Sequence, residues 1–227
     1  MIADSYDFEV DNVRYKICNN ELVLIGRNAA IGVPKKLVIP ACIQGMPVKR
    51  IAMLALHWSQ VEMLYLPDTL SVIEEHAFKE CPFLTHVEFY RADVNDSMRS
   101  PSLILREGAF CHNRALKTFR NTVQVISRCE YYTFRLCTAL TELDAAFLWL
   151  DFRPFMDTDN LKYIRIANGG KWKSDTFGCS GIKELRFDGT VTASDSALKA
   201  VRAKHWVCTN RFNRLNAAGS RTKISYQ

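Results

Sequence analysis

The chain has 227 residues, of which 48% are apolar, and its formal net charge is +6. This apolar content excludes a disordered protein, and no run approaches the roughly 18 apolar residues of a membrane-spanning helix, so no transmembrane segment is predicted. The charge is uneven. Residues 160–227 hold 13 Lys and Arg against 4 Asp and Glu, a net of +9, whereas residues 1–159 hold 17 against 20, a net of −3.

Residues 1–33 are predicted to form a β cap. Apolar residues at 8 and 10 and at 13, 15 and 17 alternate on either side of an Asp11-Asn12 turn, which is typical of a β-hairpin, and residues 22–25 favour a further strand. The first ten residues contain acidic side chains and lack the apolar core of a secretion signal, so we expect a cytoplasmic location if Met1 is the native first residue.

Residues 34–188 contain a repeated unit, which decides the fold class. The clearest copy, residues 64–84, reads LYLP, then AF, C and L at fixed spacing, and it restarts at Val87, 23 residues after Leu64. Related strands recur at residues 37–39, 119, 143, 164 and 185. Because no single copy can bury its own apolar side, stacked copies predict an α/β, mostly β, solenoid of about six repeats with one parallel strand per repeat.

The segments LVIPACIQGMPVKRI and LYLPDTLSVIEEHAFKECPFLTHVEF resemble the BspA-like leucine-rich repeat family, and the resemblance covers roughly residues 34–188. It implies a leucine-rich repeat solenoid with a parallel sheet on its concave side. It also implies a non-enzymatic, protein-binding or adhesin-like role, often at the surface of bacteria or parasitic protists. The first residues do not show the secretion signal usual in the family, so a cytoplasmic and a cell-surface or secreted location both remain open.

Eight cysteines are spread along the chain, and none forms a Cys-x-x-Cys pair. Several fall at one position of the repeat, where a small apolar side chain suits a tight inner turn. We therefore expect free, buried, reduced thiols rather than disulfides at Cys18, Cys42, Cys81, Cys111, Cys129, Cys137, Cys179 and Cys208.

Residues 189–227 are predicted to form a helical cap and a basic tail. Leu198, Val201 and His205 recur at helical spacing after a Ser/Asp start, so residues 194–207 favour a short amphipathic helix that covers the last coil. The basic end could bind nucleic acid or an anionic surface, which is the alternative to a protein-binding function, or it could be a solvated end that adds only solubility.

Residues between the inward-facing strand positions should face solvent on the concave sheet. The candidate binding site is the resulting row, with Tyr163 from the preceding row, and consists of Tyr65, Glu88, Arg120, Asp144, Tyr163, Arg165 and Arg186. Adjacent parallel strands lie about 4.8 Å apart, so the four charged residues from Glu88 to Arg165 should form a ladder of alternating charge. These charges either neutralise one another or form a recognition surface for a protein partner. The sequence specifies neither that partner nor the oligomeric state.

The insertion at residues 91–102 offers either a second binding face or a tolerated surface loop. The chain contains no Walker loop, no Gly-x-Gly-x-x-Gly and no His-Glu-x-x-His. Cys111 and His112 are neighbours that should point to different sides of a coil, and the remaining His and Cys do not converge. No catalytic, metal or cofactor site is therefore predicted.

Overall fold

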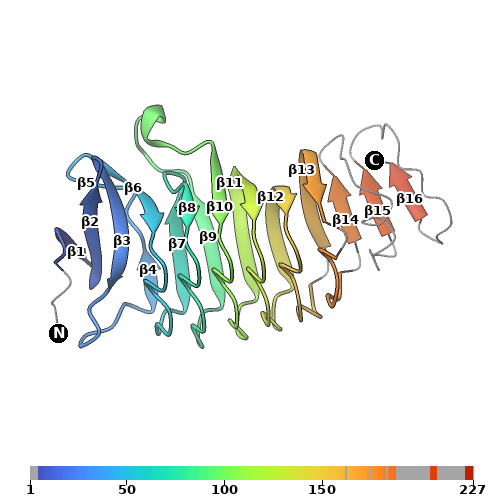
Figure 1. The fold of residues 1–227 in the computed structure, drawn as a ribbon, viewed down its shortest axis with the longest axis horizontal. Coiled ribbons are helices and arrows are strands. Elements are labelled where there is room, and N and C mark those ends of the chain that lie inside the picture. The colour runs from blue at the N-terminus through green and yellow to red at the C-terminus, as the bar shows by residue number, and fades with distance from the viewer. Residues whose placement is uncertain are drawn as a thin grey trace.

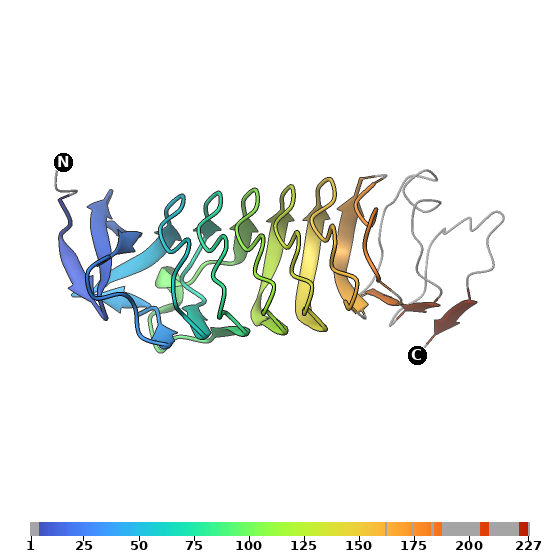
Figure 2. The same ribbon diagram turned by 90° about the horizontal axis from the view of Figure 1, so that it is seen from below.

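The computed structural model describes residues 5–161, 163–173, 175–182, 184–187, 205–208 and 223–226. These residues form a stack of coils whose strands lie side by side along the longest axis of the molecule (Figure 1). The turns of successive coils line up along one edge of the stack (Figure 2). Such a stack is the solenoid that the repeat predicts, and it is almost entirely β.

The N-terminal cap is an antiparallel sheet, as predicted. Strand β1 (Phe8–Val10) pairs with β2 (Val13–Cys18), which pairs with β3 (Glu21–Arg27). Both hairpin turns need left-handed backbone, and Asp11, Asn12, Asn19 and Asn20 supply it with φ between 50° and 64°. Strand β3 then pairs in parallel with β6 (Met46–Ile51), so the cap continues directly into the coils, beside the short strand β5 (Cys42–Ile43).

The coils carry two parallel ladders, where the sequence predicted one. The first ladder contains β4 (Lys36–Val38), β7 (Met63–Pro67), β9 (His86–Tyr90), the first parts of β11 (Thr118–Cys129), β12 (Glu142–Leu150) and β13 (Tyr163–Trp172), and then β14 (Glu184–Phe187), β15 (His205–Cys208) and β16 (Lys223–Tyr226). The second ladder contains β6, β8 (Val72–Ile73), β10 (Ser102–Leu105) and the later parts of β11, β12 and β13. Strands as short as β8 carry too few residues to show period-two alternation, which is why the sequence did not indicate them.

A column of stacked phenylalanines fills the core at the turn edge. The rings of Phe78, Phe110, Phe134, Phe155 and Phe177 lie 5.0, 5.8, 5.9 and 6.4 Å apart in succession, and each pair is within 10° of parallel. These five side chains are at most 3% exposed. The aromatic position of each repeat therefore packs against the same position of the next coil.

The turn around each phenylalanine is held by one backbone geometry that repeats. The flanking residues adopt left-handed backbone, as at His76 (φ 57°) and Glu80 (φ 56°) around Phe78. The N–H of Phe78 donates to the carbonyl of Ala109 at 2.9 Å, and the N–H of Phe110 donates to Thr133 at 2.9 Å. Each turn thus satisfies the backbone of its neighbour, as stacking requires.

The cysteine position of the repeat has a hydrogen-bonding role. The Cys137 thiol donates to the Phe110 carbonyl at 3.2 Å, and the buried Cys81 thiol lies 3.2 Å from the Leu56 carbonyl. The same position in other coils is occupied by Asn113 and Thr158, which also donate to turn carbonyls. The position therefore selects a small donor rather than an apolar filler.

Of the seven cysteines whose side chains the structure describes, all are free, as expected. Burial raises the pKa of the thiol to about 12 at Cys129 and to about 11 at Cys111. The expectation of burial is wrong for Cys18 and Cys179, which are exposed, and Cys42 is only half-buried. Cys18 ends a strand of the cap and Cys179 has left-handed backbone in a turn, so neither occupies an inward position.

The predicted C-terminal helix is wrong where it can be compared. Residues 205–207 belong to strand β15, in which Trp206 pairs with Leu185 of β14. Strand β15 lies between β14 and β16, and its aromatic and β-branched residues favour a strand over a helix. Residues 194–204 of that prediction lie outside the described residues. Within the described ranges, no helix has the length and apolar character needed to cross a membrane.

Candidate binding surface

The register of the first ladder places most of the predicted row together. Tyr65 pairs with Glu88, Glu88 with Arg120, and Arg120 with Asp144. Leu64, Val87, Phe119 and Leu143, which precede them, are all fully buried. Since side chains alternate along a strand, the row faces away from the core. The first-ladder strands β7, β9, β11, β12, β13 and β14, which lie side by side (Figure 1), therefore share one outer face.

The row steps sideways at Arg165, contrary to the prediction of a straight ladder. The residue opposite Arg165 in the register is Ala146 rather than Asp144. The cause is a shortened corner in β12. Between the two ladders, β11 runs from Asn121 to Ile126, whereas β12 covers the same partners from Ala145 to Phe147. The Arg165 side chain still reaches back, and its Nη1 lies 3.7 Å from Oδ1 of Asp144.

The two ends of the surface each contain a tyrosine stacked with a cation. At one end Lys36 Nζ lies 5.1 Å from the ring centre of Tyr65, and the ring of His86 lies 5.9 Å from the same ring. At the other end the guanidinium of Arg186 lies 3.9 Å from the ring centre of Tyr163. Such stacking holds long side chains in place and limits the entropy that a partner's binding would remove.

In the middle of the surface the charges alternate, but Arg120 has no ion-pair partner among the described residues. Glu88 contacts His86 at 3.2 Å, and Asp144 contacts Arg165. Arg120 is exposed and, among the described residues, takes part in no ion pair, although it lies between Glu88 and Asp144 in the register. The guanidinium of Arg120 thus keeps its donors available to a ligand.

A second charged array, which the sequence did not indicate, follows the second ladder. Charged residues lie at the ends of its strands or directly after them, and all their contacts except that between Arg128 and Glu130 link one coil to the next. The contacts run in the order Arg50, Glu74, Arg106, Glu130, Arg128, Asp151 and Lys173. Here each carboxylate contacts two cations, so this array is satisfied internally and differs from the row on the first ladder. The regular spacing of these charged residues can be recognised only when the strands of the second ladder are known.

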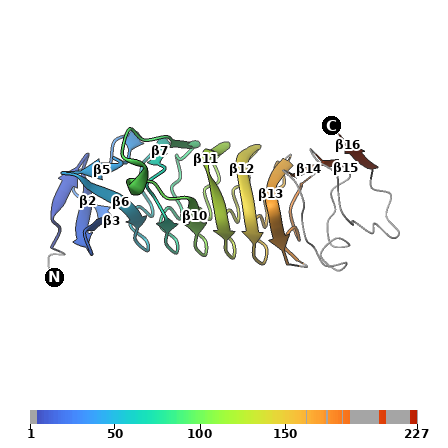
Figure 3. The same ribbon diagram turned by 90° about the horizontal axis from the view of Figure 1, so that it is seen from above.

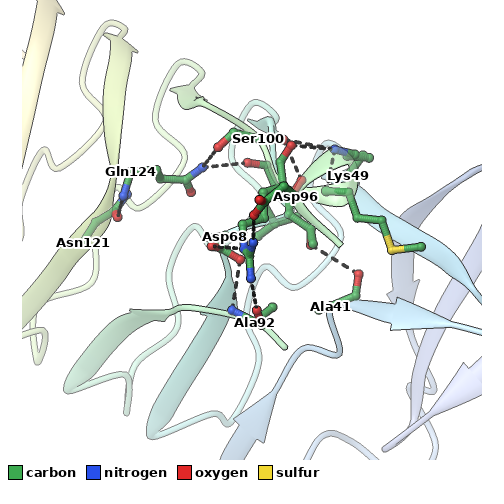
Figure 4. Close-up of polar contacts among 12 residues, drawn as sticks. Ala41, Lys49, Asp68, Ala92, Asp96, Ser100, Asn121 and Gln124 are labelled. Atoms are coloured by element: carbon green, nitrogen blue, oxygen red, sulfur yellow. Dashed lines mark hydrogen bonds and ion pairs between the residues drawn. The ribbon is translucent and has the colours of Figure 1, made fainter. Parts of the chain in front are cut away.

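The insertion at residues 91–102 is tied down onto the coils. It contains the short 3-10 turn η1 (Asp96–Met98) and lies over the end of the molecule near β6 (Figure 3). Lys49 Nζ donates to the Met98 carbonyl at 2.8 Å and to Ser100 Oγ at 3.3 Å, and Arg99 lies 3.3 Å from the buried carboxylate of Asp68 (Figure 4). Burial lowers the pKa of the Lys49 ammonium.

No catalytic arrangement is found at Cys111 and His112. Cys111 is 5% exposed, and burial keeps its thiol protonated by raising its pKa to about 11. A neutral thiol is a poor nucleophile. In the part of the chain that the structure describes, no three His, Cys, Asp or Glu side chains are grouped to hold a metal ion.

The turn edge carries an exposed aromatic that the sequence analysis did not single out. Trp58 is 64% exposed and, with Glu80, Pro82, His112 and Arg114, lines an open groove of about 390 Å³.

A family model and a solved structure agree with this fold. The family description "BspA type Leucine rich repeat region (6 copies)" matches residues 49–144 and 103–217, which together exceed half of the chain. A leucine-rich cell surface protein from Faecalibacterium prausnitzii is 17% identical with a TM-score of 0.50, over 90% of this chain and 46% of that one. A leucine-rich repeat protein from Bacteroides capillosus is 22% identical with a TM-score of 0.49, over 60% of this chain and 95% of that one. No curated protein matches significantly.

The residues that carry the family match are the ones that build the coils. The matched ranges include the strands of both ladders from β8 to β14 and the phenylalanine column. The repeat, the two ladders and the family match lead to one assignment: the chain belongs to the BspA-type leucine-rich repeat family.

Proposed function

We propose that this chain is a non-enzymatic protein-binding module, of the interaction or adhesin type, that binds its partner on the outer face of the first ladder. The family and its fold are commonly used for protein interaction and are typically non-enzymatic. The proposed contact residues are Tyr65, Glu88, Arg120, Asp144, Tyr163, Arg165 and Arg186.

The observation that carries the proposal is that Arg120 is exposed and has no ion-pair partner among the described residues. An exposed guanidinium that takes part in no ion pair among the described residues, on a rigid parallel ladder, presents five fixed donors to a partner. The neighbouring tyrosine anchors are already stacked with cations, so little side-chain freedom is lost on binding. Tyr and Arg are also the side chains that most often dominate interface energetics.

The test is capture of partners from an extract of the source organism on the immobilised chain. Arg120→Glu, Glu88→Lys and Arg165→Glu should each lose a protein that the wild-type chain captures, while circular dichroism stays unchanged. Lys16→Glu is the matched control, because Lys16 is an exposed cation on β2 of the cap. Retention of the same captured proteins by all three variants would contradict the proposal.

A second candidate function rests on the charge segregation of the sequence. Residues 160–227 carry a net charge of +9, although most of their basic residues lie outside the described ranges. Binding of nucleic acid or an anionic surface there predicts retention on heparin that weakens steeply as salt rises. Elution at low salt would remove this candidate, and it would leave the ladder proposal untouched.

A further inference from the structure

The row of side chains along the first ladder is complementary in charge to the same row read in the opposite direction. From β7 to β14 the row reads Tyr65, Glu88, Arg120, Asp144, Arg165 and Arg186. Read backwards against itself, the row places Arg186 opposite Tyr65, Arg165 opposite Glu88, and Asp144 opposite Arg120. Each of these three combinations is attractive, and none brings like charges together.

We propose that the outer face of the first ladder binds a second copy of this chain, face to face, about a two-fold axis between β11 and β12. This inference rests on the proposed function and names the partner. A two-fold axis parallel to the strands turns one face toward the other, reverses the order of the coils and keeps the strand direction. The interface is therefore isologous, because each contact between two different residues occurs twice.

The centre of this interface follows from the observed register. Thr118 and Arg120 of β11 are opposite Glu142 and Asp144 of β12 within one chain. Across the axis, Arg120 of one copy meets Asp144 of the other, and Thr118 meets Glu142. Both contacts place a donor against a carboxylate. Two sheets that pack face to face lie about 10 Å apart, a separation that an extended Arg and a carboxylate side chain together span.

The outer contacts use the remaining members of the row. Glu88 of one copy meets Arg165 of the other, and Tyr65 meets Arg186. The sideways step at Arg165 amounts to two residues, about 6.6 Å along the strand, and Arg186 shares it because Arg186 pairs with Arg165. The length of an Arg side chain covers this offset in both outer contacts. Arg186 already stacks on a tyrosine at 3.9 Å within its own chain, so a second aromatic ring can approach the other side of its guanidinium.

The area of this face indicates that two copies should associate weakly. Six strands about 4.8 Å apart and five residues of about 3.3 Å give a projected area of roughly 470 Å² per copy. Stable interfaces bury about 800 Å² per partner, so the dimer belongs to the weak class and depends on charge. Association should therefore appear at high protein concentration and low salt.

The experiment is sedimentation equilibrium of the full chain at concentrations up to about 0.5 mM, a range suited to a weak interface. The wild-type chain should be in monomer–dimer equilibrium, and dissociation should increase from about 0.1 M to about 1 M salt as the Debye length falls from about 10 Å to about 3 Å. Arg120→Glu and Asp144→Arg should each weaken dimerisation about tenfold or more. Lys16→Glu, with the same charge change in the cap, should not.

The double variant Arg120→Glu/Asp144→Arg is the decisive measurement. It exchanges the two charges, so both central contacts are restored across the axis, and dimerisation should return to within about threefold of the wild-type value. A double variant as weak as the single variants overturns the two-fold arrangement, as does a wild-type chain that stays monomeric. If the chain is monomeric while Arg120→Glu still loses a captured protein, self-association is refuted and the proposed function stands.

Discussion

Replacement of Asn113 by Ala tests whether the cysteine position of the repeat serves as a hydrogen-bonding position. Asn113 is fully buried, and its Nδ2 donates to the carbonyls of Phe78 and Phe110 at 2.9 Å each. Its Oδ1 accepts from the N–H of Cys81 at 2.7 Å. The variant loses these three buried hydrogen bonds, each worth about 1 kcal/mol, and leaves the N–H of Cys81 without its acceptor. The free energy of unfolding should therefore fall by about 3–4 kcal/mol.

Urea unfolding of the wild-type chain and Asn113→Ala measures this loss by linear extrapolation, and thermal unfolding should shift down by roughly 6–12 °C. Asn113→Cys is the matched variant, because Cys137 donates to the Phe110 carbonyl from the same position of the next coil. It keeps a donor and should lose only about 1–2 kcal/mol. A loss below about 1 kcal/mol for Asn113→Ala, or equal losses for both variants, would refute the hydrogen-bonding role.

Three further outcomes follow from packing, charge and thiol burial. Phe110→Ala removes the ring that stacks on both neighbours in the column and should lower the free energy of unfolding by about 3–5 kcal/mol in urea titrations. Arg99→Ala leaves the carboxylate of Asp68 buried without its cation, so the insertion should become open to limited proteolysis, and an unchanged cleavage pattern would contradict this. Cys18, which is exposed, should react with a thiol reagent at pH 8. Cys129, whose pKa is raised to about 12 by burial, should stay unmodified even at pH 9 until the chain unfolds, and mass spectrometry can measure both modifications.

The first ladder and the phenylalanine column were predictable because their residues recur at fixed spacing with apolar character. Leu64, Val87, Phe119 and Leu143 are buried as the repeat requires. The second ladder was not predictable, since a strand such as Val72–Ile73 has two residues and no alternation. Its existence depends on pairing with neighbouring coils, which no local pattern records.

The arrangement of the candidate row was only partly predictable. The row from Tyr65 to Asp144 follows from strand spacing alone. The step at Arg165 depends on how many residues β12 uses to turn the corner between ladders, and that number is defined only once both ladders exist. Cys18 and Cys179 are exposed because Cys18 ends a strand of the cap and Cys179 lies in a turn with left-handed backbone.

The insertion alters how the coils can unfold. In an array of stacked repeats each coil ordinarily contacts only its neighbours, so coils can fray one after another from an end. Lys49 of β6 bonds to Met98 and Ser100, which precede β10, and β8 lies between these two strands. The loop therefore connects coils that do not adjoin. The first three strands of the second ladder should open as one cooperative unit, with amide exchange in β6, β8 and β10 occurring in a single step.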